Sequence, residues 1–138
     1  MLLCRYDAAE VFVAPMAARS PREFWGRRWN MTFRNTSHRL IFAPLQAQSP
    51  VLAGALVFLW SAALHEYLVI ASLRTSTGEM GAFFVIHGIA ALLDTRFRAR
   101  APLPKAMGIG LHWLWMWCTS PLFFAPLLAI VPIPRISW

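Results

Sequence analysis

A histidine and a glutamate lie side by side at positions 65 and 66, inside an otherwise apolar run from Val51 to Leu73. A neutral imidazole is tolerated in apolar surroundings and is also the form that a general base requires, so His65 is a candidate catalytic residue. Glu66 points about 100° away around a helix, and we interpret it as a supporting residue that pairs with an arginine or carries a proton. For His65 the alternative is a structural hydrogen bond between helices, and the residues alone leave both interpretations open.

A second group of candidate residues is the segment FWGRRWN, residues 24–30. It contains two tryptophans and two arginines, Trp25, Trp29, Arg27 and Arg28. Together these side chains suit an anionic, partly aromatic ligand, of which an acyl-CoA is an example. Asn30 follows Gly26 by four residues, so on a helix a small residue lies one turn below its amide, where backbone or ligand can approach closely. The alternative is an anchor at the membrane interface, since Trp and Arg favour that depth.

Three further histidines are His38, His87 and His112. His87 and His112 lie in apolar segments and suit hydrogen bonds between helices, with His87 in a supporting role. No two of the chain's apolar-segment histidines stand three or four residues apart, and no cysteine or aspartate partner stands close to them, so the pattern predicts no metal site. His38 is expected at the surface.

The composition defines the class of protein in which these residues must be positioned. The chain has 138 residues, enough for one domain. It is 58% hydrophobic with a mean hydropathy of +0.51, and 14% of its residues are charged, against about 25% in soluble domains. We therefore predict an all-α protein with several membrane-crossing helices. Cys4 and Cys118 indicate no disulfide framework, and the N-terminal residues lack the apolar stretch of a cleavable signal peptide.

Residues 20–43 are predicted to form a basic amphipathic helix that lies in the membrane interface. Ser20 is a favoured N-cap, Pro21 suits the first helical position, and Glu23 at the third position completes a capping box. Pro44 is expected to end this helix.

Three apolar segments follow and are predicted to cross the membrane, at about residues 51–73, 80–94 and 106–131. The second is short and would need tilting or local thinning of the bilayer. Pro121 and Pro126 are expected to kink the third segment or break it in two.

The basic residues alternate along the chain as the positive-inside rule requires. Seven arginines precede the first predicted span, and Arg74 alone lies between the first and second. Arg96, Arg98, Arg100 and Lys105 lie between the second and third. We therefore expect the N-terminal region and the 94–105 loop to be cytoplasmic, with the 74–79 turn on the far side. A net charge of +7 also suits a polyanionic partner, but this placement favours membrane orientation, and no nucleic-acid partner is expected.

The segment SPREFWGRRWN, followed 35 residues after Asn30 by His65 in SAALHEY, resembles the wax synthase branch of the membrane-bound O-acyltransferases. Its FWGRRWN block is similar to that branch's version of the acyl-CoA motif also seen in sterol and diacylglycerol acyltransferases. FFVIHG, residues 83–88, is similar to the segment after the histidine helix, and TSPLFFAPLL to the C-terminal end. The resemblance covers roughly residues 10–132.

This resemblance implies an acyl-CoA:alcohol O-acyltransferase that makes an ester of the wax type. His65 would match the catalytic histidine and Asn30 its partner asparagine, with Glu66 and His87 in support. The acyl-CoA contacts would be Trp25, Arg27, Arg28 and Trp29. No cofactor is implied, because acyl-CoA is a substrate, and the partners are this donor, a lipophilic alcohol and the bilayer. The acceptor remains open between a fatty alcohol, diacylglycerol, a sterol and a terpenoid alcohol.

Family members usually have several more spans before the FW block, so the resemblance implies a C-terminal part of the usual length. We expect an irregular segment at residues 1–19, a wax synthase-like domain at 20–132 and a tail at 133–138, completed by a missing N-terminal part or by an oligomer. The expected location is the endoplasmic reticulum in a eukaryote or the inner membrane in a bacterium. The alternative function is a truncated, non-catalytic membrane protein that keeps the motif as a scaffold or interaction module.

Overall fold

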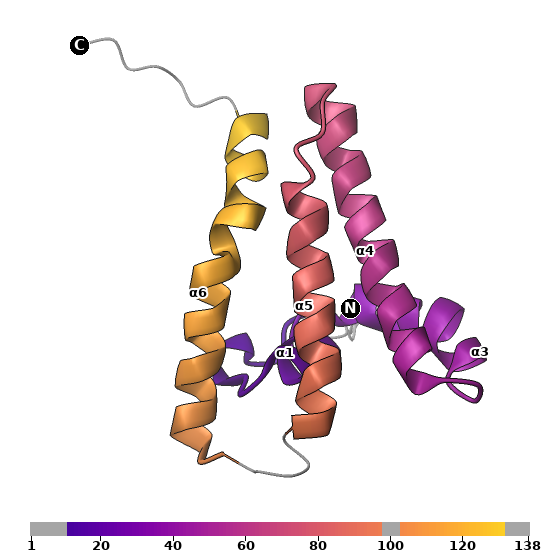
Figure 1. Ribbon diagram of the computed structural model, residues 1–138, viewed down its shortest axis with the longest axis vertical. Helices are drawn as coiled ribbons and strands as arrows, with labels where there is room; N and C mark the ends of the chain where they lie inside the picture. The colour runs from indigo at the N-terminus through magenta and orange to yellow at the C-terminus, as the bar shows by residue number, and fades with distance from the viewer. Residues whose placement is uncertain (1–10, 98–102, 132–138) are drawn as a thin grey trace, which may run out of the picture.

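The computed structural model describes residues 11–97 and 103–131, and all regular structure within these ranges is helical (Figure 1). The predicted all-α class is confirmed. The elements are η1 (Pro15–Ala17), α1 (Pro21–Arg27), α2 (Met31–Ser37), the π-helical η2 (His38–Phe42), α3 (Ala43–Leu45), α4 (Pro50–Leu73), α5 (Glu79–Phe97) and α6 (Lys105–Ile130).

Helix α1 begins where the sequence predicts. The Ser20 hydroxyl accepts a hydrogen bond from the backbone N–H of Glu23 at 3.1 Å, and Pro21 takes the first helical position. The Glu23 carboxylate reaches back to the N–H of Arg19 at 3.0 Å, one residue before the N-cap. The capping box is thus present with its return bond displaced by one residue.

The structure differs from the predicted single helix over residues 20–43, because the chain turns at Asn30. Helix α1 ends at Arg27, and Asn30 adopts a left-handed backbone conformation with φ of 43° before α2 begins. Its side-chain oxygen caps α2 by accepting from the N–H of Phe33 at 3.1 Å. Asparagine tolerates this conformation and is a favoured N-cap, so Asn30 suits both the end of one helix and the start of the next.

Beyond this turn, the helical path runs from α2 through η2 into α3 and ends at Leu45. Pro44 lies inside α3 rather than ending the helix before it. The wider π-helical turn of η2 directly precedes this proline, and such turns absorb an interruption in the hydrogen-bond ladder.

The three long helices α4, α5 and α6 run up, down and up beside one another (Figure 1). Ser49 caps α4 by accepting from the N–H of Leu52 at 3.2 Å, and Arg74 ends it in the left-handed region with φ of 58°. Helix α6 stays one continuous element through Pro121 and Pro126, so the predicted break into two pieces does not occur.

Within the described residues, two helices are long and apolar enough to cross a membrane, α4 and α6. Only 17% and 11% of their most apolar stretches are buried inside the protein, so these helices direct most of their apolar surface outward. A core helix of a soluble protein would be mostly buried instead. Helix α5, which carries Glu79, Asp94 and Arg96, is not one of these two helices.

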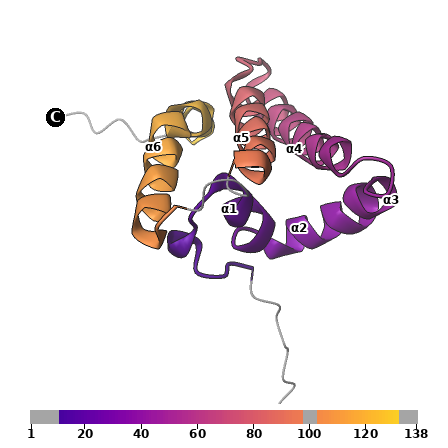
Figure 2. The ribbon, with the colours of Figure 1, turned by 60° about the horizontal axis from the view of Figure 1, so that its bottom comes forward.

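The short helices lie at one end of the three long ones. Seen from that end, α1, α2 and α3 follow one another from beside α5 to the start of α4 (Figure 2). The indole N–H of Trp113 in α6 donates to the carbonyl of Met16 at 3.1 Å, which ties the segment before α1 to α6. The C-terminal end of α5 and the start of α6 therefore lie at the same end of the protein as α1 (Figure 1).

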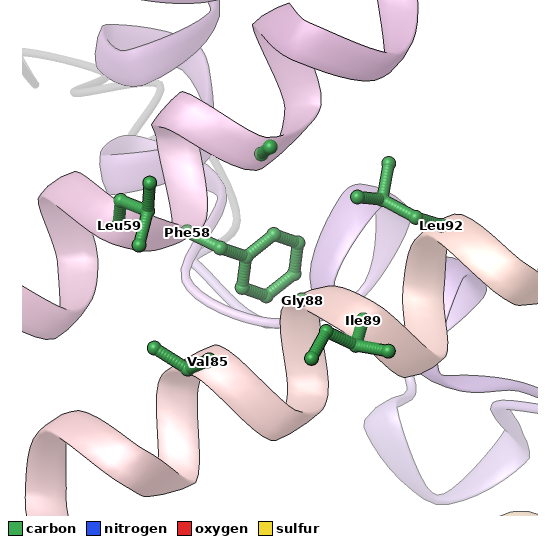
Figure 3. Close-up of a pocket in the computed structure, with 7 residues that line it drawn as sticks. Phe58, Leu59, Val85, Gly88, Ile89 and Leu92 are labelled. Atoms are coloured by element: carbon green, nitrogen blue, oxygen red, sulfur yellow. The ribbon is translucent and has the colours of Figure 1, made fainter.

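The buried core lies between α4, α5 and α6, with α1 packed against it. Its buried members are Ala62, Val69, Met80, Phe83 and Phe84. Helices α4 and α5 approach closely where Gly88 faces Phe58, because a methyl group added at Gly88 would lie 2.7 Å from the Phe58 Cβ (Figure 3). This contact fixes how α5, and the histidine that precedes Gly88, faces α4.

Candidate functional site

His65 lies on α4, partly buried, with its ring against α5. Its Nδ1 is 2.7 Å from the carbonyl oxygen of Ser61, one turn earlier in the helix. Its ring packs against Phe84 in a tilted arrangement, at a centroid distance of 4.1 Å and an angle of 34°. A carbonyl oxygen only accepts, so Nδ1 carries the proton of the neutral ring and Nε2 carries the lone pair. No described residue forms a hydrogen bond with Nε2.

Glu66 uses its carboxylate to fix the turn between α4 and α5. One oxygen accepts from the Ser76 hydroxyl and from the N–H of Gly78 at 3.1 Å, and the other accepts from the N–H of Gly81 at 2.9 Å. Gly81 is in the first turn of α5, where a carboxylate is favourable. The partners of Glu66 in the described chain are thus this turn rather than an arginine.

His87 is completely buried and joins three helices. The indole N–H of Trp25 in α1 donates to His87 Nδ1 at 3.1 Å, and His87 Nε2 is 2.9 Å from the Thr119 hydroxyl of α6. That hydroxyl in turn donates to the carbonyl of Trp115 at 2.9 Å. The expectation of hydrogen bonds from His87 to other helices is confirmed.

These partners determine the protonation of the His87 ring. An indole N–H only donates, so Nδ1 must be the bare nitrogen, and the ring proton of the neutral imidazole sits on Nε2. The Thr119 oxygen accepts this proton while donating its own to the backbone. Both ring nitrogens of His87 are therefore satisfied, and the residue is held as one tautomer.

Arg28 is occupied within the N-terminal region. Its guanidinium donates to the Glu23 carboxylate at 2.6 and 3.0 Å and to the carbonyls of Val13 and Ala14 at 3.2 and 3.1 Å. Partial burial alone would raise the pKa of Glu23, but hydrogen bonds from Arg28 and Arg19 outweigh it and lower the pKa from 4.5 to about 2. Glu23 therefore stays ionised and anchors Arg28 across the start of α1.

The remaining residues of the FWGRRWN segment face different surroundings. Arg27 is exposed, and Trp29 is 38% exposed while stacking on Phe24 at 5.2 Å. Trp25 turns inward against α5. A methyl group added at Gly26 would contact nothing within 4 Å, so the surface beside this glycine is open.

Asn30 and His65 do not contact each other directly. No hydrogen bond joins them among the described residues, since the Asn30 oxygen is engaged by Phe33 and His65 by Ser61. The Asn30 amide N–H groups keep their donor capacity, because only its oxygen is used in the cap. The pairing of these two residues in catalysis therefore stays a prediction.

Two hollows on the surface of the described residues are apolar. One, of about 120 Å³, opens between α4 and α5 around the Gly88–Phe58 contact and is lined by Ala55, Phe58, Leu59, Val85, Gly88, Ile89 and Leu92 (Figure 3). Another, of about 230 Å³, lies between η2 and α4 around Leu40 and Trp60. Neither is lined by His65 or Asn30.

Sequence reasoning missed Thr119, Ser61 and Phe84. Thr119 appears in the sequence only as a small polar residue in an apolar segment, with nothing to connect it to a histidine 32 residues earlier. The spacing of Ser61 and His65 by four residues did carry a signal, because a helical side chain reaches the carbonyl one turn before it.

The family of this all-helical chain follows from comparison with known sequences. Residues 8–86, more than half of the chain, match the Membrane bound O-acyl transferase family. The chain belongs to this family.

Several relatives from Arabidopsis thaliana are similar to the chain. Probable long-chain-alcohol O-fatty-acyltransferase 2 is 33% identical over 113 residues, which is 75% of this chain and 33% of the relative. Probable long-chain-alcohol O-fatty-acyltransferase 1 is 36% identical over 90 residues, 58% of this chain and 26% of the relative. The chain thus spans about a third or less of the length of the curated relatives it matches. No solved structure gives a significant match.

Proposed function

We propose that this chain carries the catalytic histidine of an O-acyltransferase that moves a fatty acyl group from acyl-CoA to the hydroxyl of a lipophilic alcohol. Two facts support the reaction class: the family membership, and the naming of relatives as long-chain-alcohol O-fatty-acyltransferases. The single observation that carries the proposal is the state of His65. Its Nδ1–H is held by the Ser61 carbonyl, so its Nε2 lone pair is available as a base.

The proposed reaction at His65 is a direct acyl transfer. Nε2 accepts the hydroxyl proton while the alcohol oxygen attacks the thioester carbonyl carbon. The carbon–sulfur bond then breaks, the ester is released, and the imidazolium returns its proton to the leaving sulfur as CoA thiol. The Ser61 carbonyl stabilises the transient imidazolium through the Nδ1–H bond.

The residues around α1 are proposed to receive the donor. Asn30 would donate through its unused amide N–H groups to the thioester oxygen as negative charge develops there. Arg27 and Trp29 would contact the CoA, since one is an exposed cation and the other a partly exposed aromatic ring. Arg28 and Trp25, which have partners inside the protein, would act in the same site by holding α1 in place.

The proposed topology has three spans, with α5 crossing the membrane beside α4 and α6. The basic residues of the sequence alternate between the predicted spans, and the end of α5 and the start of α6 lie at the same end as α1 (Figure 1); both observations support it, and this end would be cytoplasmic. A cytosolic acyl-CoA would then meet α1 directly. The membrane would be the endoplasmic reticulum in a eukaryote or the inner membrane in a bacterium.

The test is ester formation by membranes that carry the protein, with radiolabelled acyl-CoA and a long-chain alcohol. His65→Asn keeps an amide donor at the depth of Nδ1 for the Ser61 carbonyl but removes Nε2. We expect ester formation to fall by about 10²- to 10⁴-fold, the usual contribution of a general base. Tyr67→Phe is the matched control, because the neighbouring Tyr67 side chain is 64% exposed.

Equal ester formation by wild type and His65→Asn would reject the enzymatic proposal for this chain. That result, with both proteins present in the membrane at equal amounts, would favour the second function, a membrane protein that uses the motif as a scaffold.

A further inference from the structure

The completely buried His87 has no part in the proposed proton transfer, yet both of its ring nitrogens form hydrogen bonds to other helices. It accepts from Trp25 of α1 and donates to Thr119 of α6, while lying on α5 itself. Burying an imidazole in an apolar core is costly unless its polar atoms are satisfied, and here both are. One side chain thus connects three helices through directional contacts.

A continuous set of ring contacts leads from His87 to the proposed base. The Trp25 ring lies 5.7 Å from the ring of His87 and 5.7 Å from that of Phe84. Phe84 in turn packs against His65, with the ring centroids 4.1 Å apart. Trp25 therefore contacts both the anchor at His87 and the aromatic ring that packs on His65.

We propose that His87 is a positioning residue for the reaction at His65, acting through Trp25. This inference rests on the proposed function. The hydrogen bond to His87 Nδ1 sets the rotation of the Trp25 indole and so the place of α1 relative to His65, together with the exposed Arg27 at the end of α1 and Trp29 just after it. Thr119 completes the arrangement by holding the His87 proton on Nε2, which leaves Nδ1 free to accept.

Packing alone would not give this arrangement. Trp25 also contacts Phe58 and Phe83, at 6.4 and 6.2 Å between ring centroids, and such contacts tolerate several rotations of the ring. The N–H to Nδ1 bond selects one rotation, because the indole has a single donor. The role of His87 therefore depends on an acceptor at the position of Nδ1, and not only on a side chain of suitable volume.

Two amide variants separate these roles. His87→Asn places a carboxamide at the depth of Nδ1 and keeps an acceptor for Trp25. His87→Gln places it at the depth of Nε2 and keeps the partner for Thr119. Each variant loses one of two bonds, so their thermal midpoints should fall by similar amounts. Leu93→Ala, an exposed change on the same helix, is the control.

Ester formation and the indole ¹⁵N–¹H signal of Trp25, assigned with Trp25→Phe, are measured on each variant. We expect His87→Gln to lose activity about tenfold or more, the effect of one lost buried hydrogen bond. We expect His87→Asn to keep activity within about threefold of wild type, with the Trp25 signal near its original position. Equal activities in the two variants, at similar stabilities, would overturn the positioning role.

The outcomes also separate this inference from the proposed function. If His65→Asn abolishes activity but His87→Gln is as active as wild type, only the positioning role fails. If wild type makes no more ester than His65→Asn, the proposed function fails, and the role of His87 in catalysis fails with it. In that case, a Trp25 signal that is displaced in His87→Gln but not in His87→Asn would still support the hydrogen bond by which His87 positions α1. A Trp25 signal that is displaced in neither variant would overturn it.

Discussion

His65 and His87 lie on neighbouring helices in similar apolar sequence, yet their surroundings are opposite. His87 has no exposed surface and uses both ring nitrogens, with partners from two other helices. His65 is partly buried and uses only Nδ1, with a partner from its own helix. Both nitrogens of the His87 ring have hydrogen-bond partners within the protein, whereas the Nε2 of His65 has none among the described residues. A structural histidine and a candidate base differ in whether the second ring nitrogen forms a hydrogen bond within the protein. Position in an apolar segment does not distinguish them.

The comparison predicts the largest difference in stability. His87→Ala removes a fully buried ring and leaves the Trp25 N–H and the Thr119 hydroxyl without their partner, which should cost roughly 2–4 kcal/mol of unfolding free energy. His65→Ala loses one hydrogen bond within a helix and one ring contact and should cost about 1 kcal/mol. Thermal unfolding in detergent measures both.

The control for this pair is the amount of helix in each folded variant, which should match wild type by far-ultraviolet circular dichroism. A His65→Ala variant that is destabilised as strongly as His87→Ala would show that His65 is also a structural residue. The proposed difference between the two histidines would then be lost.

The close contact between Gly88 and Phe58, beside His87, predicts a smaller change in stability. Gly88→Ala brings a methyl group to 2.7 Å from the Cβ of Phe58, so α5 must move from α4, at a cost of about 1–3 kcal/mol. Gly26→Ala meets nothing within 4 Å and lies in α1, so it should be stabilising by up to about 1 kcal/mol. Thermal midpoints of the two variants check this.

The two glycine variants should change the free energy of unfolding in opposite directions. If Gly88→Ala were as stable as wild type, α4 and α5 would not be held at this distance, and His87 would not be fixed opposite Trp25 by close packing. A destabilised Gly26→Ala would contradict the open surface at that glycine.

Most of the helical framework could be predicted from the sequence. Apolar length locates α4 and α6, and the Ser20, Pro21 and Glu23 pattern locates the start of α1. The break at Asn30 was missed because Trp25, Trp29 and Phe33 recur every four residues across it, as aromatic residues on one face of a continuous helix do. Asn30 accepts a hydrogen bond from the backbone N–H of Phe33, three residues later. The preference of asparagine for this N-cap position is the local signal that competes with the aromatic spacing.

The candidate site could be predicted only in part, because its residues meet through tertiary packing. Glu66 was interpreted as a supporting residue because it points away from His65 around the helix. Its partners Gly78 and Gly81 could not be predicted, because they depend on the path of the turn between α4 and α5. Likewise, the bond from Trp25 to His87 spans 62 residues, and no helical periodicity connects positions that far apart. Local physics thus predicts the elements, and the packing of α1 on α5 determines which of their polar residues meet.

The smallest expected change in stability concerns the ion pairs of Glu23 at the start of α1, the helix that carries Trp25. Glu23 binds Arg28 and Arg19, and its pKa is lowered from 4.5 to about 2. A lowered carboxylate pKa contributes stability that is complete above about pH 4.5 and is lost as the pH falls through about 2. Because water screens this partly exposed cluster, the contribution should be about 1 kcal/mol. Glu23→Gln should therefore lower the thermal midpoint at pH 6 and approach wild type near pH 2. A difference between wild type and variant that stays constant from pH 6 to pH 2 would show that the ionised carboxylate does not stabilise the start of α1.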